Sequence, residues 1–234
     1  KTARLFSVLA GKDAIDCTDS YGFTVNRFFV PWLNESTRLL QEGIATKAET
    51  DFVCRKLFGI GMGPFALMNA TGVPIAYHSE KTLEVFGKLY EVAEALKAQA
   101  ESGKPWEIEP GVETIDSSKE NIIRDRMLGI VFFVSSQILE EKVSSAVHLN
   151  RGAIIGLRWK KGPVDLMKSA GEPEVKRLVS MIAGLYGMKT PSFIGGKCWE
   201  TESVKLEKNK SVAVLTMDQP ENMNTLSEST VKEL

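Results

Sequence analysis

Few side chains in this sequence could carry acid–base, nucleophilic or metal chemistry. The 234 residues include two histidines, His78 and His148, and three cysteines, Cys17, Cys54 and Cys198. A histidine can act as a general base near neutral pH, but we expect both histidines to lie at helix ends or on the surface. The cysteines are odd in number, far apart and in no C-x-x-C arrangement, so the sequence indicates neither a disulfide framework nor a zinc site. Unpaired thiols fit a reducing, cytoplasmic compartment.

A glycine-rich segment at residues 59–63 (GIGMG) has some similarity to dinucleotide-binding loops. Its third glycine follows the second by two residues instead of three, no predicted strand precedes it, and Pro64 follows it. A dinucleotide loop needs the strand, the wider spacing and an uninterrupted helix start. We therefore interpret residues 59–63 as a loop between two helices.

The composition excludes several classes of protein. With 43% hydrophobic and 25% charged residues, the chain is an ordinary globular sequence. Lys and Arg number 29 against 30 Asp and Glu, so no basic field favours nucleic acid or an anionic membrane surface. The longest uncharged apolar run, residues 127–139, is too short to span a bilayer. We expect small-molecule or protein partners, with no nucleic acid and no membrane.

The elements that must position any site are mostly helices. A short helix up to Ala10 and a strand over residues 14–18 are expected first, followed by a domain boundary near residues 19–22. Beyond it, apolar residues recur at the helical period over 25–42, a helix that should bend at Pro31. A capping box at residues 46–49 (TKAE) predicts the next helix. A third helix is predicted over 81–100.

The helical pattern repeats at a fixed spacing. Arg126 lies 99 residues after Arg27, and Gly162-Pro163 lies 99 residues after Gly63-Pro64, with no gap needed between them. Further matches at this spacing are Leu39 with Ile138, Glu42 with Glu141, Ile44 with Val143, Met68 with Met167 and Gly72 with Gly171. We interpret this as an internal duplication whose two units pack as pseudo-symmetric partners.

The last residues change character again. Residues 211–217 (SVAVLTM) predict a strand, and residues 218–220 (DQP) predict a turn. A lone strand has no sheet of its own, so we expect it to belong to a further domain.

Two motifs resemble one enzyme family. Residues 22–27 (GFTVNR), which begin the first long helix, and residues 62–67 (MGPFAL) are similar to the two signatures of the C-terminal helical domain of NAD-dependent 3-hydroxyacyl-CoA dehydrogenases. Residues 159–163 (WKKGP) resemble the second-copy motif of the long multifunctional members. Residues 212–227 resemble the opening strand and turn of the enoyl-CoA hydratase, or crotonase, family. Together these resemblances imply a multifunctional fatty-acid β-oxidation protein.

The resemblance implies that the enzyme oxidises a 3-hydroxyacyl-CoA to a 3-oxoacyl-CoA, with NAD as cofactor and acyl-CoA as substrate. Neither His78 nor His148 lies in a segment like the family's catalytic His-Phe-Phe-x-Pro, and no NAD loop is present, so both are expected upstream of Lys1. Asn26 matches the family's substrate-facing asparagine, which implies that its amide positions the substrate's 3-oxygen. Capping of the helix is the alternative role for Asn26. Arg27 recurs as Arg126, so we expect it to pair with an acidic group.

The expected organisation is mainly all-α, with two tandem helical units, a residual helix and strand at the N-terminus and a short β segment at the C-terminus. The predicted parts are 1–21 (end of an NAD-binding Rossmann domain), 22–101 (helical copy 1), 102–118 (linker), 119–190 (helical copy 2), 191–210 (linker) and 211–234 (start of a crotonase-like domain). Asp125 replaces Asn26 in copy 2, so that copy is expected to be structural. The units could form a homodimer or an intrachain pseudo-dimer. The competing hypothesis is a non-catalytic helical scaffold or interaction module.

Overall fold

The structure, a computed structural model, describes residues 5, 9–192, 194–201, 204–219, 223–226 and 230–231. Within this part of the chain the fold is mainly α-helical, with one two-stranded sheet. The predicted mainly all-α fold class is therefore confirmed. None of the described helices combines the length and the hydropathy that crossing a bilayer requires.

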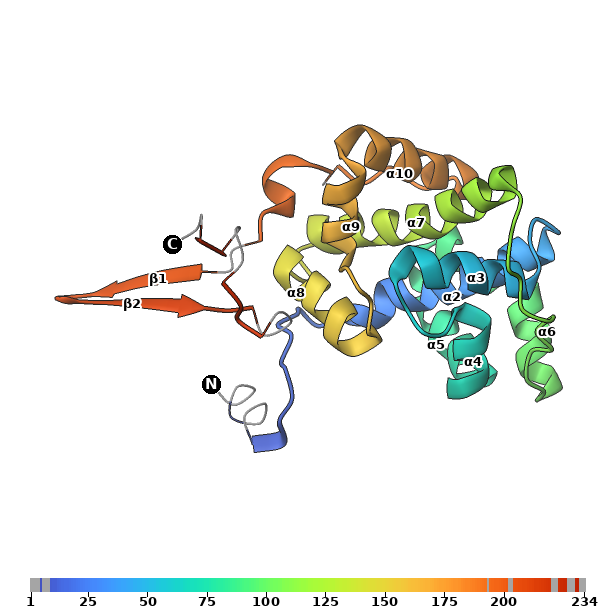
Figure 1. The fold of residues 1–234 in the computed structure, drawn as a ribbon, viewed down its shortest axis with the longest axis horizontal. Helices are drawn as coiled ribbons and strands as arrows, with labels where there is room; N and C mark the ends of the chain where they lie inside the picture. The colour runs from blue at the N-terminus through green and yellow to red at the C-terminus, as the bar shows by residue number, and fades with distance from the viewer. Residues whose placement is uncertain are drawn as a thin grey trace.

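The helices fall into two successive groups. The first comprises α2 (Val25–Gln41), α3 (Lys47–Phe58), α4 (Pro64–Thr71), α5 (Val73–Leu83) and α6 (Glu94–Ser102), with short turns η1 (Glu84–Phe86) and η2 (Lys88–Tyr90). The second comprises α7 (Ser117–Glu140), α8 (Ala146–Arg151), the π-helical turn η3 (Gly152–Gly156), α9 (Pro163–Ala170) and α10 (Glu172–Tyr186). Figure 1 shows α2 and α7 in the middle of the body, with α10 beside α7 and α4 to α6 on the far side of α2.

The beginning of the helical body follows local sequence signals. Helix α2 contains Pro31, ends at Gln41 and is followed by Gly43 in the left-handed region at φ 68°. The predicted capping box is present at α3, because the Thr46 hydroxyl accepts from the Glu49 N–H and the Glu49 carboxylate accepts from the Thr46 N–H, at 3.2 and 2.8 Å. The two predicted helices over residues 25–42 and after residue 46 are therefore confirmed within a residue or two.

The single helix predicted over 81–100 is wrong. Helix α5 ends at Leu83, two short 3₁₀ turns follow, and α6 begins only at Glu94. Between the two turns, Gly87 takes φ 111° and ψ −172°, a conformation that side-chain-bearing residues rarely adopt and that no helix contains. The break turns Leu89 and Tyr90 into the core, where both are fully buried. The apolar residues between 81 and 100 are therefore buried by two short turns and a separate helix, and they do not form one face of a single helix.

The strand predicted over residues 14–18 is also absent, since no described segment pairs with it as a strand. Instead, the segment is held by single bonds to the loop before α8. The Thr18 N–H donates to the Val143 carbonyl at 2.8 Å, and the Ser144 hydroxyl donates to the Asp16 carbonyl at 3.1 Å. Figure 1 shows this N-terminal segment passing beside α8 before it enters α2. Alternation of apolar and polar side chains is not enough to form a sheet, because the backbone N–H and C=O groups must pair with a neighbouring strand.

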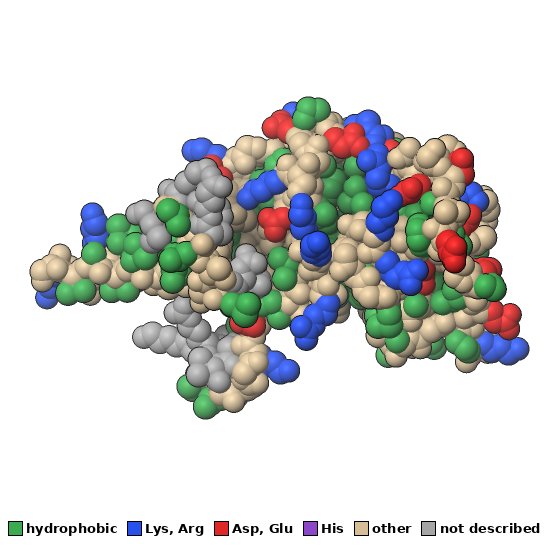
Figure 2. Space-filling model, viewed as in Figure 1, with side chains coloured by type: hydrophobic (Ala, Val, Ile, Leu, Met, Phe, Trp, Pro, Cys, Tyr) green, Lys and Arg blue, Asp and Glu red, His purple; other side chains and the backbone are tan. Residues whose placement is uncertain are grey.

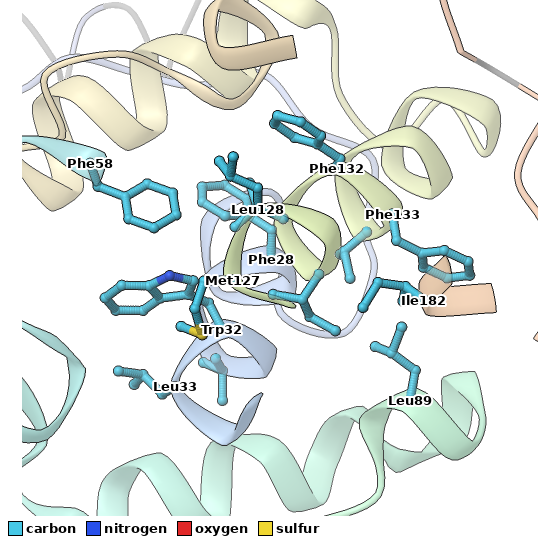
Figure 3. Close-up of a cluster of buried hydrophobic side chains, with 14 of the residues drawn as sticks. Phe28, Trp32, Leu33, Phe58, Leu89, Met127, Leu128, Phe132, Phe133 and Ile182 are labelled. Atoms are coloured by element: carbon cyan, nitrogen blue, oxygen red, sulfur yellow. The ribbon is translucent and has the colours of Figure 1, made fainter. Parts of the chain in front are cut away.

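The core forms where α2 crosses α7. Trp32 and Phe28 from α2 meet Met127 and Phe132 from α7, and all four side chains are fully buried. Figure 3 shows these side chains with Phe58 of α3 on one side and Ile182 of α10 on the other, so both helical groups contribute to one core. Each large apolar side chain buried in this way contributes roughly 1.5–3 kcal/mol to folding.

Helices α4 and α9, one from each group, have corresponding bounds. Helices α4 and α9 begin at Pro64 and Pro163, and end at Thr71 and Ala170, so both bounds differ by the same 99 residues. The glycine before each helix has nearly the same backbone angles, with φ −74° and ψ 177° at Gly63 and φ −73° and ψ 167° at Gly162.

Each of these helices is capped by a side chain from a neighbouring element, and the two capping residues, Asp51 and Asn150, also lie 99 residues apart. The Asp51 carboxylate accepts from the N–H groups of Phe65 and Ala66 at 2.8 and 3.0 Å. The Asn150 amide oxygen accepts from the N–H of Val164 at 2.9 Å. Because neither helix carries a side-chain cap on its own N-cap residue, these bonds satisfy amides that would otherwise be left unpaired.

The described C-terminal residues include an antiparallel hairpin, β1 (Val204–Asn209) and β2 (Val212–Met217). The expectation of a lone strand is wrong, because β1 lies within the predicted linker over 191–210 and pairs with β2. Figures 1 and 2 show the hairpin projecting from the helical body, with hydrophobic side chains along it. Of the segment that resembles a crotonase, residues 220–222 and 227 lie outside the described residues.

Candidate functional site

The candidate site lies at the start of α2, around Asn26. Asn26 is the second residue of the helix and its side chain is exposed. The N-cap position belongs to Thr24, whose side chain makes no capping bond. The alternative role for Asn26, as the cap of this helix, is therefore wrong. Its amide is left facing two surface hollows.

The first hollow lies between the start of α2 and helix α5. It has a volume of about 350 Å³, near the lower end for small-molecule sites. Besides Asn26, its lining includes Gly22, Phe23 and Leu83, and three polar side chains of α5, His78, Ser79 and Thr82. An imidazole and two hydroxyls can each donate or accept hydrogen bonds. This hollow can therefore bind a polar ligand group next to Asn26.

The second hollow lies on the other side of Asn26, against the N-terminal segment. It also has a volume of about 350 Å³, and Ile15, Cys17 and the stretch 22–26 line it. Apolar side chains, among them Ile15, Phe23 and Val25, dominate this lining.

Phe23 forms the ridge between the two hollows. It lies in the left-handed region at φ 49° and its side chain is 57% exposed, which combines backbone strain with exposure of a large apolar ring. Conformations of this kind cost about 1–3 kcal/mol and cluster at ligand sites. Neither feature is explained by packing of the core.

The two histidines lie in different places. His78 is exposed on α5, where its ring contacts Tyr77 edge-on at 5.0 Å between centroids. His148 lies in the first turn of α8, and its Nδ1 is 3.2 Å from the carbonyl oxygen of Asp16. The expected surface or helix-end positions are thus confirmed. Only His78 shares a hollow with Asn26.

Arg27 points away from the hollows into the protein, as its predicted role requires. Its guanidinium is fully buried and forms an ion pair with Glu141, with Nη1 2.6 Å from Oε2. Burial alone opposes the positive charge, but Glu141 raises the pKa of Arg27 above its ordinary value. The expectation that Arg27 pairs with an acidic group is confirmed. Its counterpart Arg126 pairs with Glu42 through two bonds, at 2.7 and 3.0 Å.

Other candidate groups carry no reactive chemistry. The GIGMG segment connects α3 to α4, as predicted, with Gly59 ending the first helix and Gly63 starting the second. Burial raises the pKa of the Cys54 thiol well above its ordinary value, so this cysteine stays protonated and inert. Among the described residues, no group of three or more His, Cys, Asp or Glu side chains is arranged to hold a metal ion.

Sequence reasoning missed the α5 side of the site. His78, Ser79 and Thr82 recur at the spacing of one helix face, but the helix was placed over 81–100 instead of 73–83, so their common orientation was hidden. Phe23 is part of the motif at residues 22–27, but the sequence does not predict a role for it, because nothing in the pattern indicates its strained backbone.

Comparisons with known proteins match the first helical group. Residues 22–106 match the model of the 3-hydroxyacyl-CoA dehydrogenase, C-terminal domain. Over 68 residues the chain is 41% identical to the mitochondrial hydroxyacyl-coenzyme A dehydrogenases of Sus scrofa and Homo sapiens, which is 29% of this chain and 22% of each relative. The chain thus spans about a fifth of the length of these curated relatives.

The fold extends this likeness beyond the matched segment. A crystal structure of 3-hydroxybutyryl-CoA dehydrogenase from Escherichia coli superposes with a TM-score of 0.69 at 15% identity, covering 82% of this chain and 61% of that one. At this identity the likeness concerns the fold alone. The chain therefore contains a segment homologous to the C-terminal domain of 3-hydroxyacyl-CoA dehydrogenases, an oxidoreductase family, and its fold is similar to that of one such enzyme.

Proposed function

We propose that this chain supplies the helical, substrate-binding part of an NAD-dependent (S)-3-hydroxyacyl-CoA dehydrogenase of fatty-acid β-oxidation. The homology of residues 22–106 supports the enzyme class. The position of Asn26, exposed on the rim of two hollows, supports a substrate-binding role and is the observation that carries the proposal. A plain scaffold would have no need to hold Phe23 strained and exposed beside it.

In this proposal Asn26 acts through position. Its amide hydrogen-bonds the 3-oxygen of the substrate and so fixes the carbon that is oxidised, which lowers the entropy cost of reaching the reactive geometry. The described residues offer no strand, glycine loop and helix in sequence that would fit NAD, so we assign them no step in hydride transfer. His78 and His148 lie outside any segment like the family's catalytic histidine motif, and the general base is proposed to lie elsewhere in the full-length protein.

The test is oxidation of a 3-hydroxyacyl-CoA with NAD by the full-length protein. Asn26→Ala should lower turnover on the order of ten- to a thousandfold if the amide holds the reacting oxygen. Asn121→Ala is the matched control, because Asn121 is an exposed asparagine near the start of α7, the helix that corresponds to α2. Full activity of Asn26→Ala would refute the positioning role of Asn26, and an inactive wild type would favour a non-catalytic scaffold.

The finer parts of the proposal concern the second helical group. We propose that it is a duplicate of the first, joined to it as an intrachain pseudo-dimer. The support is reciprocal: Arg27 of α2 pairs with Glu141, and Arg126 of α7 pairs with Glu42, the same two positions exchanged. Reciprocal contacts of this kind define a two-fold interface. Sedimentation of the chain as a monomer would support the pseudo-dimer, and a stable homodimer would contradict it.

A crotonase-like domain that starts at residues 211–234, with strand β2, and a cytoplasmic location complete the proposal. The hairpin with its exposed apolar strands supports the former. The three free cysteines support a reducing compartment for the latter. Hydration of an enoyl-CoA by the full-length protein would test the first point.

A further inference from the structure

The two hollows around Asn26 are both mainly apolar, but their polar side chains are distributed unevenly. Gly22, Phe23 and Asn26 line both, so the hollows meet at this ridge. One side presents His78, Ser79 and Thr82; the other presents Ile15 and Val25 with the thiol of Cys17. A ligand that lies across the ridge therefore meets hydrogen-bonding groups at one end and hydrocarbon at the other.

The polar side is held by one helix. His78, Ser79 and Thr82 all belong to α5, and the Thr82 hydroxyl donates back to the Ser79 carbonyl at 2.7 Å, which fixes its orientation. The Thr82 oxygen can still accept a hydrogen bond. The exposed imidazole of His78 can donate or accept. These groups suit carbonyls and amides.

The apolar side is held by packing against the second helical group. A Cβ on Gly152 of η3 would lie 2.6 Å from Val25 Cγ2 and 2.9 Å from Ile15 Cδ1, so this glycine lets both side chains approach closely. The wall they form is thus set before any ligand binds, and a preformed wall lowers the entropy cost of binding. Its side chains suit an alkyl chain.

A 3-hydroxyacyl thioester has this same polarity. On one side of its 3-oxygen carbon lie the thioester carbonyl and an amide-containing arm, and on the other side lies a hydrocarbon tail. Resting on the proposed function, we propose that the His78 hollow takes the thioester and its amide arm, while the Cys17 hollow takes the first part of the acyl tail. Asn26 holds the 3-oxygen at the ridge between them. Cys17 then limits acyl-chain length, and His78 positions the thioester arm.

Chain length is tested by filling the apolar hollow. Cys17 is exposed, so Cys17→Phe should fold normally. In the full-length enzyme it should lower kcat/KM for 3-hydroxyhexadecanoyl-CoA relative to 3-hydroxybutyryl-CoA by about tenfold, as expected when a pocket loses space for methylene groups. Cys17→Ser, which adds no bulk, should leave the ratio unchanged. An equal loss on both substrates, or no loss on either, would overturn the assignment of the tail.

The polar arm is tested at His78. His78→Leu should raise KM about three- to tenfold for both substrates without changing their ratio, because the lost hydrogen bond is to the part that they share. His78→Gln keeps a hydrogen-bonding group and should restore most of the affinity. A change in the chain-length ratio, or an unchanged KM, would overturn the assignment of the arm. These outcomes are separate from the proposed function, which fails only if the wild type is inactive, and from the positioning role of Asn26, which fails if Asn26→Ala keeps full activity.

Discussion

The guanidinium of Arg27 and the carboxylate of Glu141 join the first turn of α2 to the residue that follows α7, with Nη1 2.6 Å from Oε2 and Nη2 2.8 Å from Oε1. Arg27 is fully buried, whereas the Glu141 side chain is 44% exposed. The ring of Phe86 lies against the guanidinium, with the ring centroid 3.9 Å from Cζ of Arg27. The arginine that follows Asn26 in sequence thus anchors the site-bearing end of α2 to the second helical group.

Removing the acid should therefore weaken the fold more than removing a surface pair. Glu141→Gln leaves a buried arginine without its counter-charge, and we expect a loss of about 1–3 kcal/mol in the free energy of unfolding, below the value for fully buried pairs because Glu141 is partly solvated. Glu174→Gln, which breaks an exposed pair with Arg177, is the control and should cost under about 0.5 kcal/mol. Urea denaturation measures both. Equal losses in the two variants would mean that burial of Arg27 does not increase the contribution of its ion pair to stability.

Asp51 predicts a second stability effect, at the start of α4. Its carboxylate accepts from two N–H groups of that helix, so Asp51→Ala should cost about 1–2 kcal/mol. Asp51→Asn should cost much less, because Asn150 caps the equivalent helix α9 with an amide oxygen. Thermal unfolding of the two variants decides this. A similar loss in both would indicate that the charge is required.

The N-terminal caps of α3 and α4 show what the sequence could and could not predict. The capping box at Thr46 and Glu49 is local, with both partners three residues apart, so the pattern was sufficient to predict it. The cap of α4 comes from Asp51, fourteen residues before Phe65, and depends on how α3 packs on α4. No local pattern encodes such a bond, although the recurrence of the 99-residue spacing hinted that both helices begin alike.

The same limit applies to the site. The site role of Asn26, which rests on a contiguous motif, stays a prediction, whereas the acidic partner expected for Arg27 is confirmed. His78 lines a hollow with Asn26, and it belongs to α5, which a break around Gly87 separates from α6. Apolar periodicity could not reveal that break, since Leu89 and Tyr90 are buried in either arrangement. The strand predicted over 14–18 is absent because alternating side chains indicate a strand only where a partner strand is available.

Glu80 predicts a dependence of stability on pH. Its side chain is fully buried, and burial raises its pKa well above the ordinary 4.5 despite nearby Arg38. A carboxyl whose pKa is raised on folding contributes stability that is present below the unfolded pKa and is lost as pH rises toward the folded pKa. Glu80→Gln retains an oxygen that can accept the hydrogen bond from the Asn34 amide, and it removes the charge.

The variant should therefore gain stability relative to the wild type as pH rises above about 4.5, and the difference should level off once the folded-state carboxyl has ionised. Urea denaturation of both proteins over this range measures the difference directly, because all other titrating groups cancel. Parallel curves would show that Glu80 titrates alike in the folded and unfolded states.

Gly63 and Gly61 lie two residues apart in the loop between α3 and α4 but should respond differently to the same substitution. A Cβ on Gly63 would lie 2.4 Å from Asp51 Cα, too close for any side chain, whereas a Cβ on Gly61 would meet nothing within 4 Å. Because the clash is with backbone, it cannot be relieved by a rotamer change, and Gly63→Ala should cost about 1–3 kcal/mol.

Gly61→Ala should be within about 0.5 kcal/mol of the wild type. Gly162→Ala extends the comparison to the second helical group, where the Cβ would lie 2.4 Å from Asn150 Cα. It should lose about as much stability as Gly63→Ala, because the same close contact precedes α9. A tolerated Gly63→Ala would mean that α3 and α4 can separate without loss. A harmful Gly61→Ala would instead point to a requirement of the loop for glycine conformations, as a dinucleotide-binding segment would have.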